Sequence, residues 1–206
     1  MTIRDALKKT RKIQIFEDTP MVAKTVAEEF KGIFPEIQIE VVKKANTNEN
    51  GVFSIAIGSI GDLKKRGIDF FKTDKENFVF CKIDEQGAGV LACSHQQFLY
   101  GYASNLLDDE LDKSLEPFLK GKLTEPAFKW QRSCYDYFLT QPGRIQKNLN
   151  RETYIKQMAK FGFTHIEVNG LAYPMALETG PEGETYPMFY TYCPALDQFV
   201  YSDLNK

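Results

Sequence analysis

Along the first 110 residues of this 206-residue chain, segments with the apolar pattern of strands alternate with segments that have the apolar spacing of helices. This alternation limits the folds that the chain can form. Apolar residues at every second position predict short, half-buried strands near 13–16 and 37–41, and an apolar run predicts another at 52–57. Between the first two, apolar residues at helical spacing predict a helix over 20–33, with Thr19 as its N-cap and Pro20 as its first residue. This alternation favours an α/β fold with a mixed sheet.

The pattern continues beyond residue 58. A weaker helical stretch at 60–66 precedes two apolar runs at 78–83 and 89–93, which we expect to form a hairpin around the turn at 84–87. Ser94 and Gln97 have capping-box spacing at the start of a helix that ends near residue 107. We therefore predict a compact α/β domain over 1–125, its sheet covered by helices on at least one face. The polar stretch 108–125 is interpreted as a connector on the surface.

After Pro126 the pattern changes. The segment 128–139 is typical of a strand and 140–149 of a loop. Asn150 is then the predicted N-cap of a helix that Gly162 terminates, and a strand follows at 163–169. Strand, helix, strand is how a (β/α)8 barrel begins, but such a barrel needs roughly 250 residues. We predict that residues 126–206 are the beginning of a barrel, truncated after the first strand, helix and second strand.

Composition excludes several functional classes. Lys and Arg number 26 against 28 Asp and Glu, divided 18 to 20 up to residue 126 and 8 to 8 after it, so neither part has the basic surface that suits nucleic acid. Two histidines and four widely separated cysteines give no metal-site spacing and favour buried free thiols. Nucleotide and phosphate-binding glycine motifs are absent, and we expect no cofactor and no metal. Without a signal peptide or a long apolar run, the sequence predicts a cytoplasmic protein with no membrane contact.

Three segments together resemble a known group of proteins. They are the helix SHQQFLYGYASNLL at 94–107, the W-x-R-x-x-x-D strand containing Trp130, Arg132 and Asp136, and FGFTHIEVN at 161–169. They resemble the N-terminal half of glycoside hydrolases of the β-hexosaminidase and α-glucuronidase type. The resemblance implies a non-catalytic α/β domain, similar to domain 2 of the hexosaminidases, before a (β/α)8 barrel. It also implies that Arg132 and Asp136 approach the sugar and that the catalytic carboxylates lie on later strands, beyond this chain.

Two further residues are candidates for sugar contact. Asn169 ends the second predicted barrel strand, where barrel active sites lie, and it can either bind a hydroxyl group or cap the turn into Gly170. The long loop 170–203 is rich in tyrosine, and Tyr173 can either stack on a pyranose ring or pack on the barrel rim. Arg132 and Asp136 have their own alternative, a salt bridge inside the barrel. His165, deeper in the strand, is predicted to be a buried, hydrogen-bonded histidine.

The sequence thus predicts the N-terminal portion of a carbohydrate-active glycoside hydrolase that acts on O-glycosidic bonds, with a carbohydrate substrate. We assign no catalytic residue in this chain, which we expect to be inactive alone. The alternative is a complete, non-catalytic α/β module that binds a glycan or a protein partner.

Overall fold

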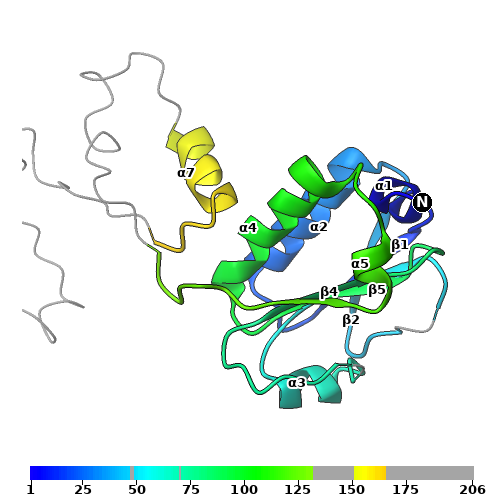
Figure 1. Cartoon of the computed structure of the whole chain (residues 1–206), viewed down its shortest axis with the longest axis horizontal. Coiled ribbons are helices and arrows are strands. Elements are labelled where there is room, and N and C mark those ends of the chain that lie inside the picture. The colour runs from blue at the N-terminus through cyan, green and yellow to red at the C-terminus, as the bar shows by residue number, and fades with distance from the viewer. Residues whose placement is uncertain (47–48, 70, 132–150, 166–206) are drawn as a thin grey trace, which may run out of the picture. The chain divides into compact units, whose positions relative to one another are not determined.

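The computed structural model describes residues 1–46, 49–69, 71–131 and 151–165 (Figure 1). The chain divides into two units, Met1–Gln131 with Lys156–Thr164, and Arg132–Ile155 with His165–Lys206. Most of the described residues belong to the first unit, which is an α/β domain built on one six-stranded mixed sheet. The predicted fold class is confirmed at this level. The predicted barrel start falls largely on residues outside the description.

The sheet combines a parallel part with an antiparallel edge. Its strands, in chain order, are β1 (Lys12–Phe16), β2 (Gln38–Val42), β3 (Val52–Ile57), β4 (Val79–Ile83), β5 (Gly89–Cys93) and β6 (Lys122–Thr124). They lie side by side in the order β2-β1-β3-β5-β4-β6. The first four strands in this order are parallel to one another, whereas β4 runs antiparallel to both β5 and β6. The β4–β5 pair is the hairpin that the sequence predicts.

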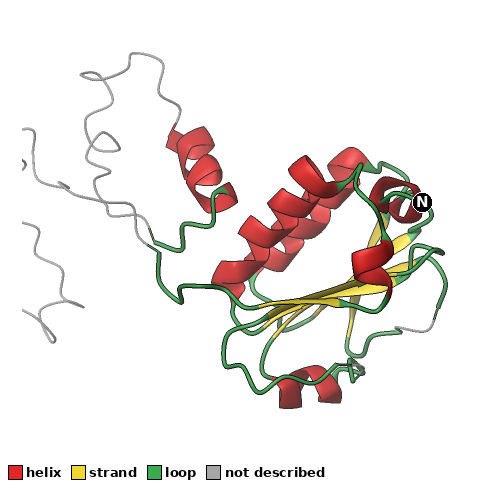
Figure 2. Cartoon of the chain, viewed as in Figure 1, coloured by secondary structure: helices red, strands yellow, loops and turns green. Residues whose placement is uncertain are grey.

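Helices cover the two faces of the sheet unequally (Figure 2). One face carries four helices and a π-helical turn: α1 (Ile3–Leu7), α2 (Met21–Ile33), α4 (Gln96–Asn105), η1 (Leu106–Glu110) and α5 (Glu116–Leu119). The opposite face carries α3 (Ile60–Lys65) and the irregular segment that follows it. The coverage on at least one face that we predict is confirmed, and the second face is covered as well.

Strand alternation decides which side chains enter which core. In β1, Ile13 and Ile15 belong to the core under α2 and α4, whereas Phe16 belongs to the core under α3. Gln14, between the two isoleucines, points to the α3 face, where the register places it opposite Ser54 of β3. On the α3 face of β1, the middle of the strand is therefore polar and its carboxyl end is apolar.

The prediction that 108–125 is a surface connector is wrong. Leu111, Leu115 and Phe118 are buried in the helix-covered core, and the segment ends in β6, an edge strand of the sheet. These three residues have the i, i+4, i+7 spacing of one helical face, which the acidic neighbours around them obscure in the sequence. The segment also pairs with the N-terminus of the chain, through the Thr2–Ser114 bridge.

Of the three predicted N-caps, Asn150 lies outside the described residues, and Thr19 and Ser94 are wrong. Helix α2 begins at Met21 with Pro20 as its N-cap, and the Thr19 hydroxyl accepts a hydrogen bond from the backbone N–H of Phe16. Helix α4 has His95 as its N-cap, while the Ser94 hydroxyl bonds to the backbone of Phe78. In each case a neighbouring strand end supplies a partner for the hydroxyl, and the helix proceeds without a side-chain cap.

The helix predicted before Gly162 is present as α7 (Arg151–Lys160). Gly162 follows it with a φ of 83°, a left-handed conformation that favours glycine. In the part of the chain that the structure describes, no helix has the length and apolar character needed to cross a bilayer.

Candidate functional site

The four predicted sugar contacts, Arg132, Asp136, Asn169 and Tyr173, lie outside the described residues. They remain predictions. His165 is described, and it is exposed, so the prediction that it is buried is wrong. It is the third residue of the predicted strand 163–169 and lies three residues after the turn at Phe161 and Gly162, close to the end of α7.

Gln131 and Thr164 lie within the two predicted barrel strands, 128–139 and 163–169, and the described residues 128–131 and 163–164 do not form strand structure. The backbone N–H of Thr164 donates to the carbonyl oxygen of Gln131 at 2.8 Å, and the backbone N–H of Gln131 donates to the Thr164 hydroxyl at 2.7 Å. Gln131 directly precedes Arg132, and Thr164 lies five residues before Asn169. Near Gln131 and Thr164, the two segments predicted as barrel strands therefore lie side by side.

The turn before Thr164 packs closely on α4. A Cβ added at Gly101 of α4 would lie 3.0 Å from the Cα of Gly162 and 3.3 Å from the carbonyl oxygen of Ala159. Lys160 Nζ also lies 3.1 Å from Asp108 Oδ2. The absence of a side chain at Gly101 thus allows a close helix-to-turn contact, and this contact positions Thr164.

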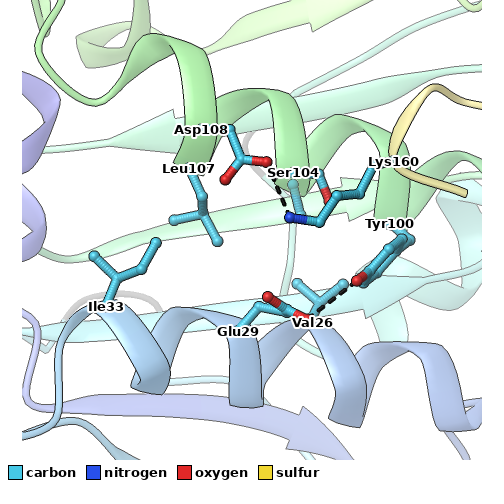
Figure 3. A pocket seen from close by; sticks show the side chains of 9 residues that line it. Val26, Glu29, Ile33, Tyr100, Ser104, Leu107, Asp108 and Lys160 are labelled. Carbon is cyan, nitrogen blue, oxygen red and sulfur yellow. Dashed lines mark hydrogen bonds and ion pairs between the residues drawn. The ribbon is translucent and has the colours of Figure 1, made fainter. Parts of the chain in front are cut away.

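A small hollow lies beside this contact, between α2 and α4 (Figure 3). The Tyr100 hydroxyl donates to Glu29 Oε1 at 3.1 Å across it, and Lys160 and Asp108 close its other end. Burial, together with the Glu29 carboxylate, raises the pKa of Tyr100 to about 12. The volume is about 10 Å³, which is room for about one water molecule. This hollow is a polar helix contact and is too small for an organic ligand.

A much larger groove, of about 420 Å³, lies at the carboxyl end of the parallel strands. Three structural elements supply its lining. Glu17 and Asp18 follow β1, Val42 ends β2 and Lys43 follows it, and Asp62 and Lys65 belong to α3, with Arg66 as its C-cap. Apart from Val42, every lining side chain is charged.

The guanidinium group of Arg66 is fixed within this groove. Its Nη1 donates to the carbonyl oxygen of Ile57 at 2.6 Å and its Nη2 donates to Asp18 Oδ2 at 2.6 Å, while the group lies over the ring of Phe16 at 5.2 Å. These contacts join the ends of β1 and β3 to α3. A guanidinium held at two points and by a ring presents its remaining N–H groups in a defined direction.

A second carboxylate in the groove is held in its charged form. The Ser59 hydroxyl donates to Asp62 Oδ2 at 2.6 Å, and this bond, with a smaller contribution from Lys65, lowers the pKa of Asp62 below its ordinary value. Ser59 is the N-cap of α3, so the same hydroxyl begins the helix and orients the carboxylate.

Among the described residues, we find neither a candidate metal site nor a reactive cysteine. No three His, Cys, Asp or Glu side chains among them are grouped to hold a metal ion. Cys81 and Cys93 are free and buried, as the sequence predicts for its thiols, and burial raises the pKa of both far above that of a reactive thiol.

Sequence reasoning did not identify the groove. The available signal is that charged residues directly follow two apolar strands, Glu17 and Asp18 after β1 and Lys43 after β2. That signal is weak, because charged residues follow most strands. The charged residues form a groove only because β1 and β2 are parallel neighbours and because α3 lies at the carboxyl ends of these strands. Both facts depend on tertiary structure.

The fold and groove define an open, mixed α/β sheet domain with a charged groove at the carboxyl edge of its parallel strands. Comparison with protein families, with curated proteins and with solved structures found no match for this chain.

Proposed function

We propose that this chain is the N-terminal portion of a carbohydrate-active glycoside hydrolase, in which the α/β domain precedes the first strand, helix and second strand of a (β/α)8 barrel. The sequence resemblance supports this proposal at its three motifs. The observation that carries it is the pairing of Gln131 with Thr164 across α7. In a parallel strand-helix-strand unit, a helix returns the chain so that the second strand can lie beside the first.

Under this proposal, Arg132 and Asp136 contact the sugar from the first barrel strand, Asn169 contacts it from the end of the second, and Tyr173 contacts it from the loop that follows. Continuing both strands in parallel from the bond between Thr164 N–H and the Gln131 carbonyl pairs Arg132 with Thr164 and Asp136 with Val168. Arg132 and Asp136 then share one face. Asn169 belongs to the other face, unless the turn at Gly170 redirects it, so the two sets require separate tests.

The test begins with the gene beyond the codon for Lys206. We expect the reading frame to continue for at least about 170 residues, the length that completes a barrel of roughly 250. The encoded longer protein should hydrolyse an aryl glycoside, and the 206-residue chain should not, because the acid and second carboxylate of glycoside hydrolysis are assigned beyond it. A stop codon after Lys206, or a longer protein inactive on a panel of aryl glycosides, would contradict the proposal.

Substitutions in the longer protein then test the sugar contacts. Asp136→Asn and Arg132→Ala should each lower kcat/KM by about tenfold or more, because each removes a charged hydrogen bond to the substrate. Asp74→Asn is the matched control, since Asp74 is an exposed carboxylate in the α/β domain and should leave kcat/KM unchanged. If Asn169→Ala lowers activity while Asp136→Asn does not, the opposite face of the strands lines the barrel.

One observation favours the alternative of a non-catalytic binding module. The groove at the carboxyl end of the sheet is built entirely within the α/β domain and needs no residue of the predicted barrel.

A further inference from the structure

The charged groove lies where the connections from two neighbouring strands leave the sheet on opposite sides. Strands β1 and β3 are adjacent and parallel. The chain continues from β1 into α2, on one face, and from β3 into α3, on the other (Figure 2). Such a divergence opens a crevice at the carboxyl ends of the strands, and open α/β sheets bind their ligands at this crevice.

The groove has the size of a small-molecule site. Its volume of about 420 Å³ lies within the range of roughly 300 to 1,000 Å³ that is typical of ligand pockets. Arg66 gives it a rigid floor, because two bonds and the Phe16 ring hold the guanidinium in place. The position of Arg66 is thus set before any ligand arrives, which reduces the entropy lost on binding.

The charges of the groove determine which ligand suits it. Its lining has three carboxylates and three cations, so its net charge is zero and it has no special attraction for a polyanion. Four of the six form two ion pairs, Arg66 with Asp18 at 2.6 Å and Lys65 with Asp62 at 3.6 Å. Within the described part of the chain, Glu17 and Lys43 remain without an ion pair.

These two residues have opposite charges and lie close together in the fold. Phe16 and Val42 are direct partners across the β1–β2 pair, so Glu17 and Lys43 are the next residues on two neighbouring strand ends. A neutral sugar would have no exposed aromatic face to stack on in this groove, since Phe16 is 3% exposed and lies beneath Arg66.

We propose that this groove binds a zwitterionic small molecule of amino-acid type. Its ammonium group would pair with Glu17, and its carboxylate group would pair with Lys43 and accept hydrogen bonds from Arg66. This site is independent of the glycoside hydrolase proposal, because all of its residues belong to the α/β domain.

Titration of the 206-residue chain, followed by backbone amide NMR, tests the charge requirement. The probes are glutamine, N-acetylglutamine, which lacks the ammonium group, and glutamine α-amide, which lacks the carboxylate. We expect saturable shifts at the amides of Glu17, Asp18 and Lys43 with glutamine, and binding about threefold to fivefold weaker for each derivative, the effect of losing one solvent-exposed charge pair. Absence of saturable shifts with glutamine, or equal affinity for all three probes, would overturn the proposal.

Two exposed substitutions assign each charge to its partner. Glu17→Gln should abolish the preference for glutamine over its N-acetyl derivative, and Lys43→Gln should abolish the preference over the α-amide. The matched controls are Glu36→Gln and Lys24→Gln, exposed residues outside the groove, which should leave all three affinities unchanged. Equal weakening by the control substitutions would show a non-specific charge effect and would overturn the site.

Discussion

The two faces of the sheet differ in how their cores are built. The face under α2 and α4 is apolar from end to end, and it receives side chains from every helix except α3. The α3 face is mixed: Glu40, Gln14 and Ser54 form one polar row across three neighbouring strands, whereas its apolar cluster includes Phe16, Ala56 and Val90, the last directly opposite Ser54. The difference indicates that the first face supplies most of the stability, while the second face supports the groove.

The largest expected effect comes from a truncation in the apolar face. Phe53 is fully buried in β3 with its ring 5.5 Å from that of Phe30, so Phe53→Ala should lower the free energy of unfolding by about 3 to 5 kcal/mol. Phe78→Ala on the α3 face should cost about 3 kcal/mol, because the irregular chain around it can close part of the cavity. Urea unfolding measures both, and an equal or greater loss for Phe78→Ala would contradict the proposed difference between the faces.

Arg66→Ala tests the connection between α3 and the strand ends. We expect a loss of about 1 to 2 kcal/mol, mainly from the hydrogen bond to the Ile57 carbonyl and the contact with Phe16, since Asp18 is exposed and its ion pair is screened by solvent. Arg66→Lys should recover little, because an ammonium group cannot reach both oxygens as a planar guanidinium does. The control is Lys65→Ala on the same helix, expected within about 0.5 kcal/mol of wild type.

Much of this architecture can be predicted from the sequence, because many of its strands and helices have clear local apolar patterns. Elements with a clear apolar run or a clear helical period, such as 52–57 and the helix with Phe98 and Leu99, lie where their patterns predict, because these local patterns determine which side chains can be buried together. The errors concern partners distant in the chain. Ser94 has capping-box spacing yet bonds to Phe78, and no local pattern reveals that Phe78 is near.

The candidate groove could not be predicted from the sequence, because its residues are also distant from one another in the chain. Glu17, Lys43 and Arg66 are separated by more than twenty residues from one another, and only the strand order β2-β1-β3 and the placement of α3 bring them to one edge. The pairing of Gln131 with Thr164, by contrast, joins two segments that the sequence predicts as strands connected by a helix, and that prediction stays untested.

Tyr100→Phe examines the polar contact between α2 and α4 on the apolar face. Loss of the hydrogen bond to Glu29 should lower the free energy of unfolding by about 1 kcal/mol at neutral pH. The pKa of Tyr100 rises from 10.0 to about 12 on folding, so the folded state favours the protonated phenol. The stabilisation should therefore be complete below pH 10 and decrease as pH rises toward 12. Unfolding free energies of both proteins across this range measure it, and a difference that grows with pH would contradict the assignment.

The smallest effect is expected at Ser54, in the polar row of the α3 face. Its side chain is fully buried, and its hydroxyl has no hydrogen-bond partner among the described atoms. An unpaired buried hydroxyl costs free energy, so Ser54→Ala should leave stability unchanged or raise it by up to about 1 kcal/mol. Gln14→Ala is the matched comparison one strand away, and it should destabilise the domain, because Gln14 bonds to both Glu40 and the backbone of Asn46. If Ser54→Ala instead costs more than about 1 kcal/mol in urea unfolding, the hydroxyl is hydrogen-bonded in solution through water, and this row is a connected polar network across the three strands.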